Sequence, residues 1–243
     1  MPESEWYASW FDTGYYHLLY QQRDFEEAKN FVHNLMHHLK LEERSQVCDL
    51  ACGNGRHSEV LASLGYDVTG LDLSSNNIAH ARKRGIPHAE FYEHDMRKLF
   101  RSSYFDLVLN LFTSFGYFDS DEEHLDTLKA IFQSLKPQGH FVLDYLNSQK
   151  LETSLIPESS YEISGVQFEV SRAMVNGFIQ KSIHIFEENK SIRFQEKVRA
   201  FSLSDLQKMM EQCGFRVIEV FGDYALAPYE EMNSDRLIIH ATK

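Results

Sequence analysis

Apolar residues recur every three or four positions from Phe25 to Leu39, which is the spacing of a helix that buries one face. At the start of this pattern, Asp24 and Glu27 have the spacing of a capping box. The preceding segment, from Trp6 to Tyr20, is dense in aromatic rings. We therefore expect about the first forty residues to be helical, with rings that pack against the rest of the chain.

From Gln46 onward, short apolar runs alternate with segments of helical periodicity. Five runs are strand-sized and rich in branched or aromatic residues: Val47–Leu50, Asp67–Leu71, Ala89–Tyr92, Phe105–Leu109 and His140–Tyr145. Three segments between them suit helices: Glu59–Leu64, Asn76–Arg84 and Asp121–Leu135. This order predicts a parallel sheet that is covered by helices on both faces.

After Leu155 the apolar positions change to a period of two, which is typical of strands with one buried face. Asn176 and Gly177 interrupt this pattern and predict a type I′ hairpin. We expect residues 156–201 to form a small antiparallel sheet of about three strands, inserted in the α/β domain.

The chain then returns to the earlier pattern. A helix is predicted from Leu203 to Cys213 with Gly214 as its C-terminal cap, followed by strands over Phe215–Phe221 and Arg236–Ala241. The complete pattern predicts a single α/β domain over residues 1–243. Its core is a seven-stranded, mostly parallel sheet, and it carries the small antiparallel sheet as an insertion.

Composition limits the partners. The chain has 24 basic and 36 acidic side chains, a formal charge of −12, which disfavours broad binding to nucleic acid. No apolar run is long enough for a membrane span, and the N-terminus lacks the pattern of a signal peptide, so we expect a cytoplasmic protein. The cysteines lack metal-binding spacing, and no carboxylate completes a HExxH pattern around His33, His37 and His38. We expect no metal site.

A turn rich in small residues follows the first predicted strand. Ala51, Gly53 and Gly55 allow a ligand to approach the backbone at the carboxyl end of a parallel strand, where open α/β sheets bind ligands. Asp72 ends the next strand and can accept both hydrogen bonds of a ribose diol. Alternatively, Asp72 only caps the following helix, a role that Ser74 or Ser75 could also fill.

The turn also indicates the kind of nucleotide. A dinucleotide fingerprint needs a third glycine, and Ser58 follows here instead; a phosphate-binding P-loop would need a Lys and a Ser or Thr after the loop. A ligand with a ribose but no phosphate fits better.

The segment Asp49-Leu50-Ala51-Cys52-Gly53-Asn54-Gly55 resembles motif I of the class I S-adenosylmethionine-dependent methyltransferases, with Ala51 where many members carry glycine. Asp72 matches the ribose-binding acid of that family, and His94-Asp95-Met96 resembles the position that holds the adenine. Leu135-Lys136-Pro137-Gln138-Gly139 is similar to the LKPGG turn of the family, with Gln138 replacing a glycine.

The resemblance implies S-adenosylmethionine as the cofactor and assigns roles to matching positions. The expected cofactor-binding residues are Asp49, Ala51, Cys52, Gly53, Gly55, Asp72, Leu73, Asp95, Met96, Asn110, Leu111 and Tyr20. The loop from Asn110 to Tyr117 resembles the loop that faces the donor methyl, which makes Tyr117 an expected catalytic residue. Tyr16, in the aromatic N-terminal segment, is the other expected catalytic residue. By the same resemblance Tyr15, Tyr16 and Tyr20 form a lid, or else they only pack the N-terminal helix on the sheet.

The resemblance also implies a Rossmann-like fold, an α/β domain whose last strand is antiparallel, and it divides the domain. Residues 1–44 correspond to a helical aromatic lid, 45–150 to the cofactor-binding core, 156–201 to the inserted sheet and 202–243 to the completion of the core. It is closest to small-molecule methyltransferases such as sugar and glycine N-methyltransferases. The implied reaction is in-line methyl transfer to nitrogen or oxygen of a small acceptor, with no evident general base.

Two other functions stay open at this point. One is a regulatory module that binds S-adenosylmethionine without transferring its methyl group. The other is methylation of RNA or protein, which predicts a basic groove beside Tyr117 and is disfavoured by the acidic charge. No sequence feature indicates an oligomeric state.

Overall fold

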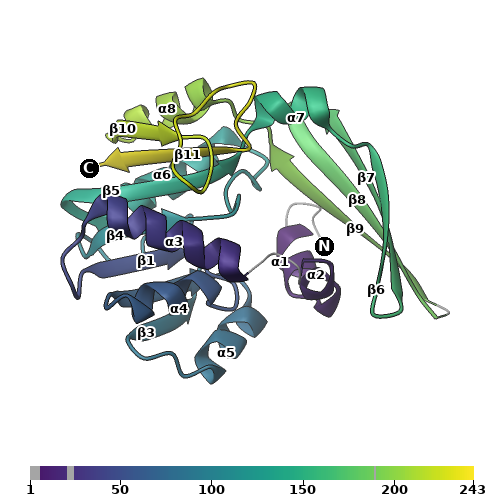
Figure 1. The fold of residues 1–243 in the computed structure, drawn as a ribbon, viewed down its shortest axis with the longest axis horizontal. Coiled ribbons are helices and arrows are strands. Elements are labelled where there is room, and N and C mark those ends of the chain that lie inside the picture. Colours follow the sequence, from purple (N-terminus) through teal and green to yellow (C-terminus); the bar gives the residue numbers. More distant parts are fainter. Residues whose placement is uncertain (1–5, 21–24, 189) are drawn as a thin grey trace.

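A seven-stranded sheet forms the centre of the computed structural model, which describes residues 6–20, 25–188 and 190–243 (Figure 1). Its strands are β1 (Gln46–Leu50), β2 (Asp67–Asp72), β3 (Ala89–Glu93), β4 (Phe105–Asn110), β5 (Leu135–Leu146), β10 (Arg216–Phe221) and β11 (Arg236–Thr242). Their order is β10-β11-β5-β4-β1-β2-β3, and only β11 runs antiparallel to its neighbours. This confirms the predicted Rossmann-like fold.

Helices cover both faces of this sheet, because its strands are apolar on both sides. One face packs against α3 (Phe25–Leu39) and α4 (Arg56–Ser63). The other packs against α6 (Asp121–Ser134) and α8 (Leu203–Gln212). Consecutive residues of β1 show the alternation: Val47 belongs to the first core and Cys48 to the second.

Two further helices complete the core region. Helix α5 (Ser75–Lys83) packs on β2 and β3, and α7 (Ser148–Ser154) leads from β5 to the inserted sheet. At the end of α8 the C-cap residue is Cys213, and the predicted Gly214 follows it with a φ of +98°, the left-handed conformation that commonly terminates a helix. Strand β5 begins five residues earlier than predicted, at Leu135, where α6 ends.

The inserted sheet has four strands, not about three: β6 (Glu158–Ile163), β7 (Val166–Val175), β8 (Phe178–Glu187) and β9 (Lys190–Arg199), all antiparallel in that order. The prediction missed β6 because this edge strand is mostly exposed and has no apolar alternation. The predicted hairpin is confirmed, since Asn176 and Gly177 both have positive φ between the paired residues Val175 and Phe178.

The described part of the N-terminal region forms three helices, within the forty or so residues that the sequence predicted to be helical. Helices α1 (Trp6–Phe11) and α2 (Gly14–Leu19) precede α3, and Thr13 caps α2 by accepting a hydrogen bond from the N–H of Tyr16. The proposed capping residue Asp24 lies outside the described residues. Trp10 of α1 is fully buried among apolar side chains of β7 and β8, so the N-terminal rings cover the inserted sheet.

Candidate functional site

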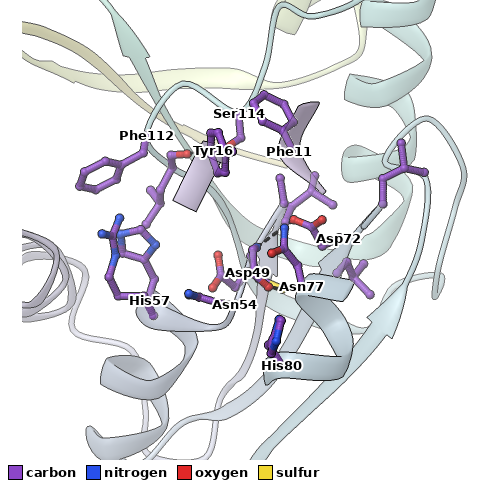
Figure 2. Close-up of a pocket in the computed structure, with 18 of the residues that line it drawn as sticks. Phe11, Tyr16, Asp49, Asn54, His57, Asp72, Asn77, His80, Phe112 and Ser114 are labelled. Atoms are coloured by element: carbon purple, nitrogen blue, oxygen red, sulfur yellow. Dashed lines mark hydrogen bonds between the residues drawn. The ribbon is translucent and has the colours of Figure 1, made fainter. Parts of the chain in front are cut away.

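A cavity of about 1060 Å³ lies at the carboxyl ends of the parallel strands. Its floor is formed by the turns after β1 and β2, its side by the loop after β4, and its roof by α1 and α2. Figure 2 shows Phe112 and His57 on one side, Asp72 and Asn77 on the other, and Asp49 between them. The cavity is at the upper end of the range that is usual for small-molecule sites, roughly 300–1,000 Å³.

The turn after β1 needs small residues for its backbone conformation. Ala51, Gly53 and Gly55 have φ values of 62°, 55° and 82°. A Cβ at Gly55 would lie 2.9 Å from the Phe91 ring, whereas a Cβ at Gly53 would meet no atom within 4 Å. Glycine is thus required at position 55 both by the packing against Phe91 and by the backbone conformation. Gly53 instead leaves space on the cavity side, where a ligand can approach the backbone.

The Asp72 carboxylate joins the two turns of the floor. One oxygen accepts a hydrogen bond from the backbone N–H of Gly53 and the other from that of Ser74, both at 2.8 Å. Ser74 itself caps α5 by accepting from the N–H of Asn77. The simple capping role therefore belongs to Ser74, and Asp72 lines the cavity, where burial raises its pKa.

Asp49 is the most deeply buried carboxylate of the floor, with 1% of the residue exposed. Burial raises its pKa to about 6, although Ser58 Oγ donates a 2.6 Å hydrogen bond to Oδ2. A buried carboxylate whose charge is poorly compensated favours a cationic ligand. Cys52 lies beside it, but burial raises the pKa of this thiol well above its usual range, so we assign the sulfur no nucleophilic role.

His57 lies on the first turn of α4 and lines the cavity. Burial lowers its pKa to about 3, so the imidazole is neutral. Its Nε2 atom is buried and has no hydrogen-bond partner among the described residues. An unpartnered polar atom in a cavity wall indicates a bound ligand or water as its partner.

The charged side chains that line the cavity match the polar groups of S-adenosylmethionine. Asp72 offers carboxylate oxygens at the position expected for a ribose diol, and Asp49 offers a buried negative charge for an ammonium group. Arg56, next to the turn, lines the same cavity and lies over the Phe112 ring at 5.2 Å, where a guanidinium suits a carboxylate.

Most of the predicted site residues meet at this cavity. The predicted residues that line it are Asp49, Ala51, Cys52, Gly53, Asp72, Leu73, Asp95, Met96, Leu111, Tyr16, Tyr20 and Tyr117. Gly55 and Asn110 do not line it. Gly55 begins α4, and the buried Asn110 side chain donates to the carbonyl of Leu50 at 3.1 Å, which ties the end of β4 to β1.

Asp95 lines the cavity, but its carboxylate already has a partner. Arg97 donates to both oxygens, with the shortest contact 2.7 Å from its Nη2 to Oδ2. Partial burial opposes ionisation, yet the hydrogen bonds from Arg97 lower the pKa of Asp95. An adenine amino group that binds Asp95 would therefore share the carboxylate oxygens with Arg97.

The roof is held at both sides of the cavity. On one side Asp12, between α1 and α2, accepts hydrogen bonds from Ser74 Oγ and from Asn76 Nδ2, the latter at 2.6 Å. On the other side Trp10 Nε1 and the Tyr20 hydroxyl each donate to Glu196 Oε1 of β9 at 2.7 Å. The roof thus connects the start of α5 to the inserted sheet.

The tyrosines of the roof differ in orientation. Tyr16 and Tyr20 line the cavity, but Tyr15 does not and instead donates to Glu187 at 2.6 Å. The expectation that Tyr15 covers the ligands was wrong, because its hydroxyl is bound to the inserted sheet. Tyr117 lines the cavity, packs on Trp6 and donates to the carbonyl of Thr113.

Several residues of the cavity were missed by the sequence reasoning. Arg56 was detectable, since it directly follows the glycine turn at the start of a helix. Phe112 has no motif of its own. Asp12 does not line the cavity but helps to hold its roof, and it was missed because it is remote in sequence from Ser74 and Asn76, which it contacts.

This fold is that of the Rossmann-like methyltransferases. Residues 20–220 match the family described as "Methyltransferase domain", and the chain belongs to this family of S-adenosylmethionine-dependent methyltransferases.

Three similar proteins illustrate the relationship. An S-adenosylmethionine-dependent methyltransferase from Clostridium acetobutylicum has a solved structure with a TM-score of 0.80, 20% identity, and coverage of 94% of this chain and 95% of the other. The dTDP-3-amino-3,4,6-trideoxy-alpha-D-glucopyranose N,N-dimethyltransferase of Streptomyces venezuelae is 35% identical over 102 residues, 42% of this chain and 43% of that protein. The glycine/sarcosine N-methyltransferase of Halorhodospira halochloris is 25% identical over 213 residues, 84% of this chain and 78% of that protein.

Among the described residues, every helix is too short or too polar to cross a bilayer.

Proposed function

We propose that the chain transfers the methyl group of S-adenosylmethionine to nitrogen or oxygen of a small-molecule acceptor by in-line displacement. The observation that carries this proposal is the extent of the cavity. It runs from the carboxylates of Asp49 and Asp72 to the aromatic roof at Tyr16 and Tyr117, and about 1060 Å³ is enough for a second ligand beside the donor.

The floor would hold the donor. Asp72 would accept the ribose hydroxyls, Asp49 would face the methionyl ammonium group, and Arg56 would face its carboxylate. Leu73 and Met96 provide apolar surface for the adenine. Bound in this way, S-adenosylmethionine supplies an activated methyl group, so the chain itself has only to position an acceptor and exclude water.

The acceptor side favours positioning over proton removal. His57 is neutral, but with a pKa of about 3 it is a weak base. The hydroxyl of Tyr117 donates to the carbonyl of Thr113, so it is held within the loop. An amine that arrives unprotonated needs no base, whereas an alcohol does. The two named relatives that act on amine nitrogen, an amino-sugar and a glycine/sarcosine enzyme, support nitrogen as the acceptor.

Methyl-labelled S-adenosylmethionine incubated with a panel of amino sugars, amino acids and matched hydroxyl compounds tests the proposal. We expect label in one acceptor class, a product that depends on acceptor concentration, and much less label with Asp72→Asn when the donor is not saturating. Binding of the donor without transfer to any member of the panel or of a metabolite extract would favour the regulatory module. Transfer to RNA or protein that high salt abolishes would favour a macromolecular substrate.

A further inference from the structure

Two histidines and a glutamate from three different elements meet at the β10–β11 edge of the main sheet. His38 Nε2 lies 2.8 Å from Glu219 Oε2, and His240 Nδ1 lies 3.1 Å from the same oxygen. His38 belongs to the last turn of α3, and Glu219 and His240 are cross-strand partners. None of the three lines the cavity described above, so this cluster is separate from the proposed methyl-transfer site.

These three atoms are a typical donor set for a divalent transition ion. Imidazole nitrogen and carboxylate oxygen bind Zn²⁺ at about 2.0–2.2 Å, which separates the ligand atoms of a tetrahedral site by roughly 3.3 Å. Here all three lie within 4.8 Å of one another, and two of the separations are already 2.8 and 3.1 Å. The ligand atoms therefore have to shift by only a few tenths of an ångström to about 1.5 Å to reach the spacing of a tetrahedral site.

The burial of the three side chains suits ion entry. The His38 and Glu219 side chains are 37% and 38% exposed, so a hydrated ion can reach them and they can adjust. The His240 side chain is only 7% exposed and provides a fixed anchor. The carbonyl end of α3, next to His38, adds a partial negative charge that favours a cation.

A third histidine, His140, lies behind His240 and supports it. His140 Nδ1 lies 3.0 Å from His240 Nε2. If the Nε2–H of His240 donates to His140, then Nδ1 of His240 carries the lone pair that a metal needs. Metal-binding histidines characteristically donate their other N–H to such a partner, which fixes the tautomer and the ring orientation.

We propose that His38 Nε2, the Glu219 carboxylate and His240 Nδ1 bind one divalent transition ion of the Zn²⁺ type, with His140 as the positioning residue and water as a fourth ligand. The ion ties the C-terminal end of α3 to β10 and β11. This differs from the expectation of no metal site, which rested on the spacing of the cysteines and on the lack of a carboxylate that completes a HExxH pattern around His33, His37 and His38. The carboxylate comes from a strand 181 residues later.

Calorimetric titration of untagged, chelator-treated full chain with Zn²⁺ tests the proposal. We expect one ion per chain, at least tenfold weaker binding for His38→Ala and Glu219→Gln, and unchanged binding for His37→Ala. His37 is the matched control, because it is exposed on the same helix turn. No Zn²⁺ binding by the original protein, or equal losses in His38→Ala and His37→Ala, would overturn the proposal.

Two further measurements identify the ligands. Co²⁺ should give the visible absorption of a tetrahedral site with nitrogen and oxygen ligands. A thiolate charge-transfer band would instead indicate cysteine ligands and contradict the proposal. His140→Phe should keep one ion per chain but weaken its binding about 10- to 100-fold, as is typical when such an outer partner is lost. Unchanged affinity in this variant would exclude the positioning role.

Discussion

The carboxylate of Asp144 accepts a hydrogen bond from the backbone N–H of Phe112 at 2.8 Å. This contact fixes the start of the loop after β4, where Phe112 and Thr113 have positive φ values of 56° and 61°. Such a conformation is unfavourable for residues with side chains and persists only where the surroundings enforce it. Arg236 completes the arrangement, donating to Asp144 Oδ1 at 2.8 Å and to Thr113 Oγ1 at 2.9 Å.

We expect Asp144→Ala to lower the free energy of unfolding by about 3–5 kcal/mol, because it leaves the Arg236 charge buried without its partner. Denaturant unfolding measures this loss, and methyl transfer should fall with it because the loop wall of the cavity loses its support. The control is Asp126→Ala, which removes an exposed ion pair with Lys129 and should cost no more than about 0.5 kcal/mol. Equal effects in the two variants would contradict the role of Asp144.

Asp72→Asn tests the ribose assignment. The carboxylate of Asp72 accepts hydrogen bonds from two backbone N–H groups. The substitution removes the charge and makes an amide N–H face one of these two donors. Charged hydrogen bonds contribute about 1.5–3 kcal/mol, so S-adenosylhomocysteine should bind roughly 10- to 100-fold more weakly by calorimetry. Asp67→Asn, at the opposite end of β2, is the matched control and should bind normally. Normal binding by both variants would show that Asp72 does not bind the cofactor.

The affinity for S-adenosylmethionine should depend on pH through Asp49. Its pKa is about 6 in the ligand-free protein, and a bound ammonium group would favour the ionised carboxylate. Below this pH, binding must therefore release a proton, and we expect the affinity to fall by about tenfold per pH unit and to level off above about pH 7. In Asp49→Asn the affinity should be weaker and flat between about pH 5 and pH 7. A wild-type profile that is equally flat would argue against contact between Asp49 and the donor.

Glu196→Gln tests the attachment of the roof. The side chain of Glu196 accepts from Trp10 and Tyr20 and pairs with Lys181 at 3.4 Å, and an amide nitrogen facing that lysine would be repelled. We expect faster proteolysis within the first twenty residues and a several-fold rise in the acceptor KM, since a net loss of about 1 kcal/mol corresponds to roughly fivefold. Glu169→Gln changes an exposed side chain of β7 and should alter neither value. Unchanged proteolysis in Glu196→Gln would mean that apolar packing alone holds the roof.

The floor of the cavity was predictable because its signals are local. A buried strand, a turn of small residues and Asp72 at the end of the next strand follow one another within about 25 residues, and parallel strands bring their carboxyl ends together. The sequence also offered Ser74 or Ser75 as the cap of the following helix, and the structure assigns the cap to Ser74.

The roof and the loop support were not predictable, because their partners are remote along the chain. Asp144 meets Arg236 across 92 residues, and nothing in either neighbourhood marks them as a pair. Tyr15 and Tyr16 are adjacent and chemically alike, yet one binds the inserted sheet and the other lines the cavity. Strand β6 was missed for a different reason, since its pairing with β7 depends on backbone hydrogen bonds that do not require apolar side chains.

The hydrogen bond between Trp10 and Glu196 joins residues 186 positions apart. At a synthesis rate of about 5–20 residues per second, Trp10 is made roughly ten to forty seconds before its partner. During that interval the rings of α1 and α2 have no native surface to cover, and chaperones that bind exposed apolar segments would have access to them. Helices α1 and α2, although translated well before β9, would thus reach their final positions only after the inserted sheet has been made.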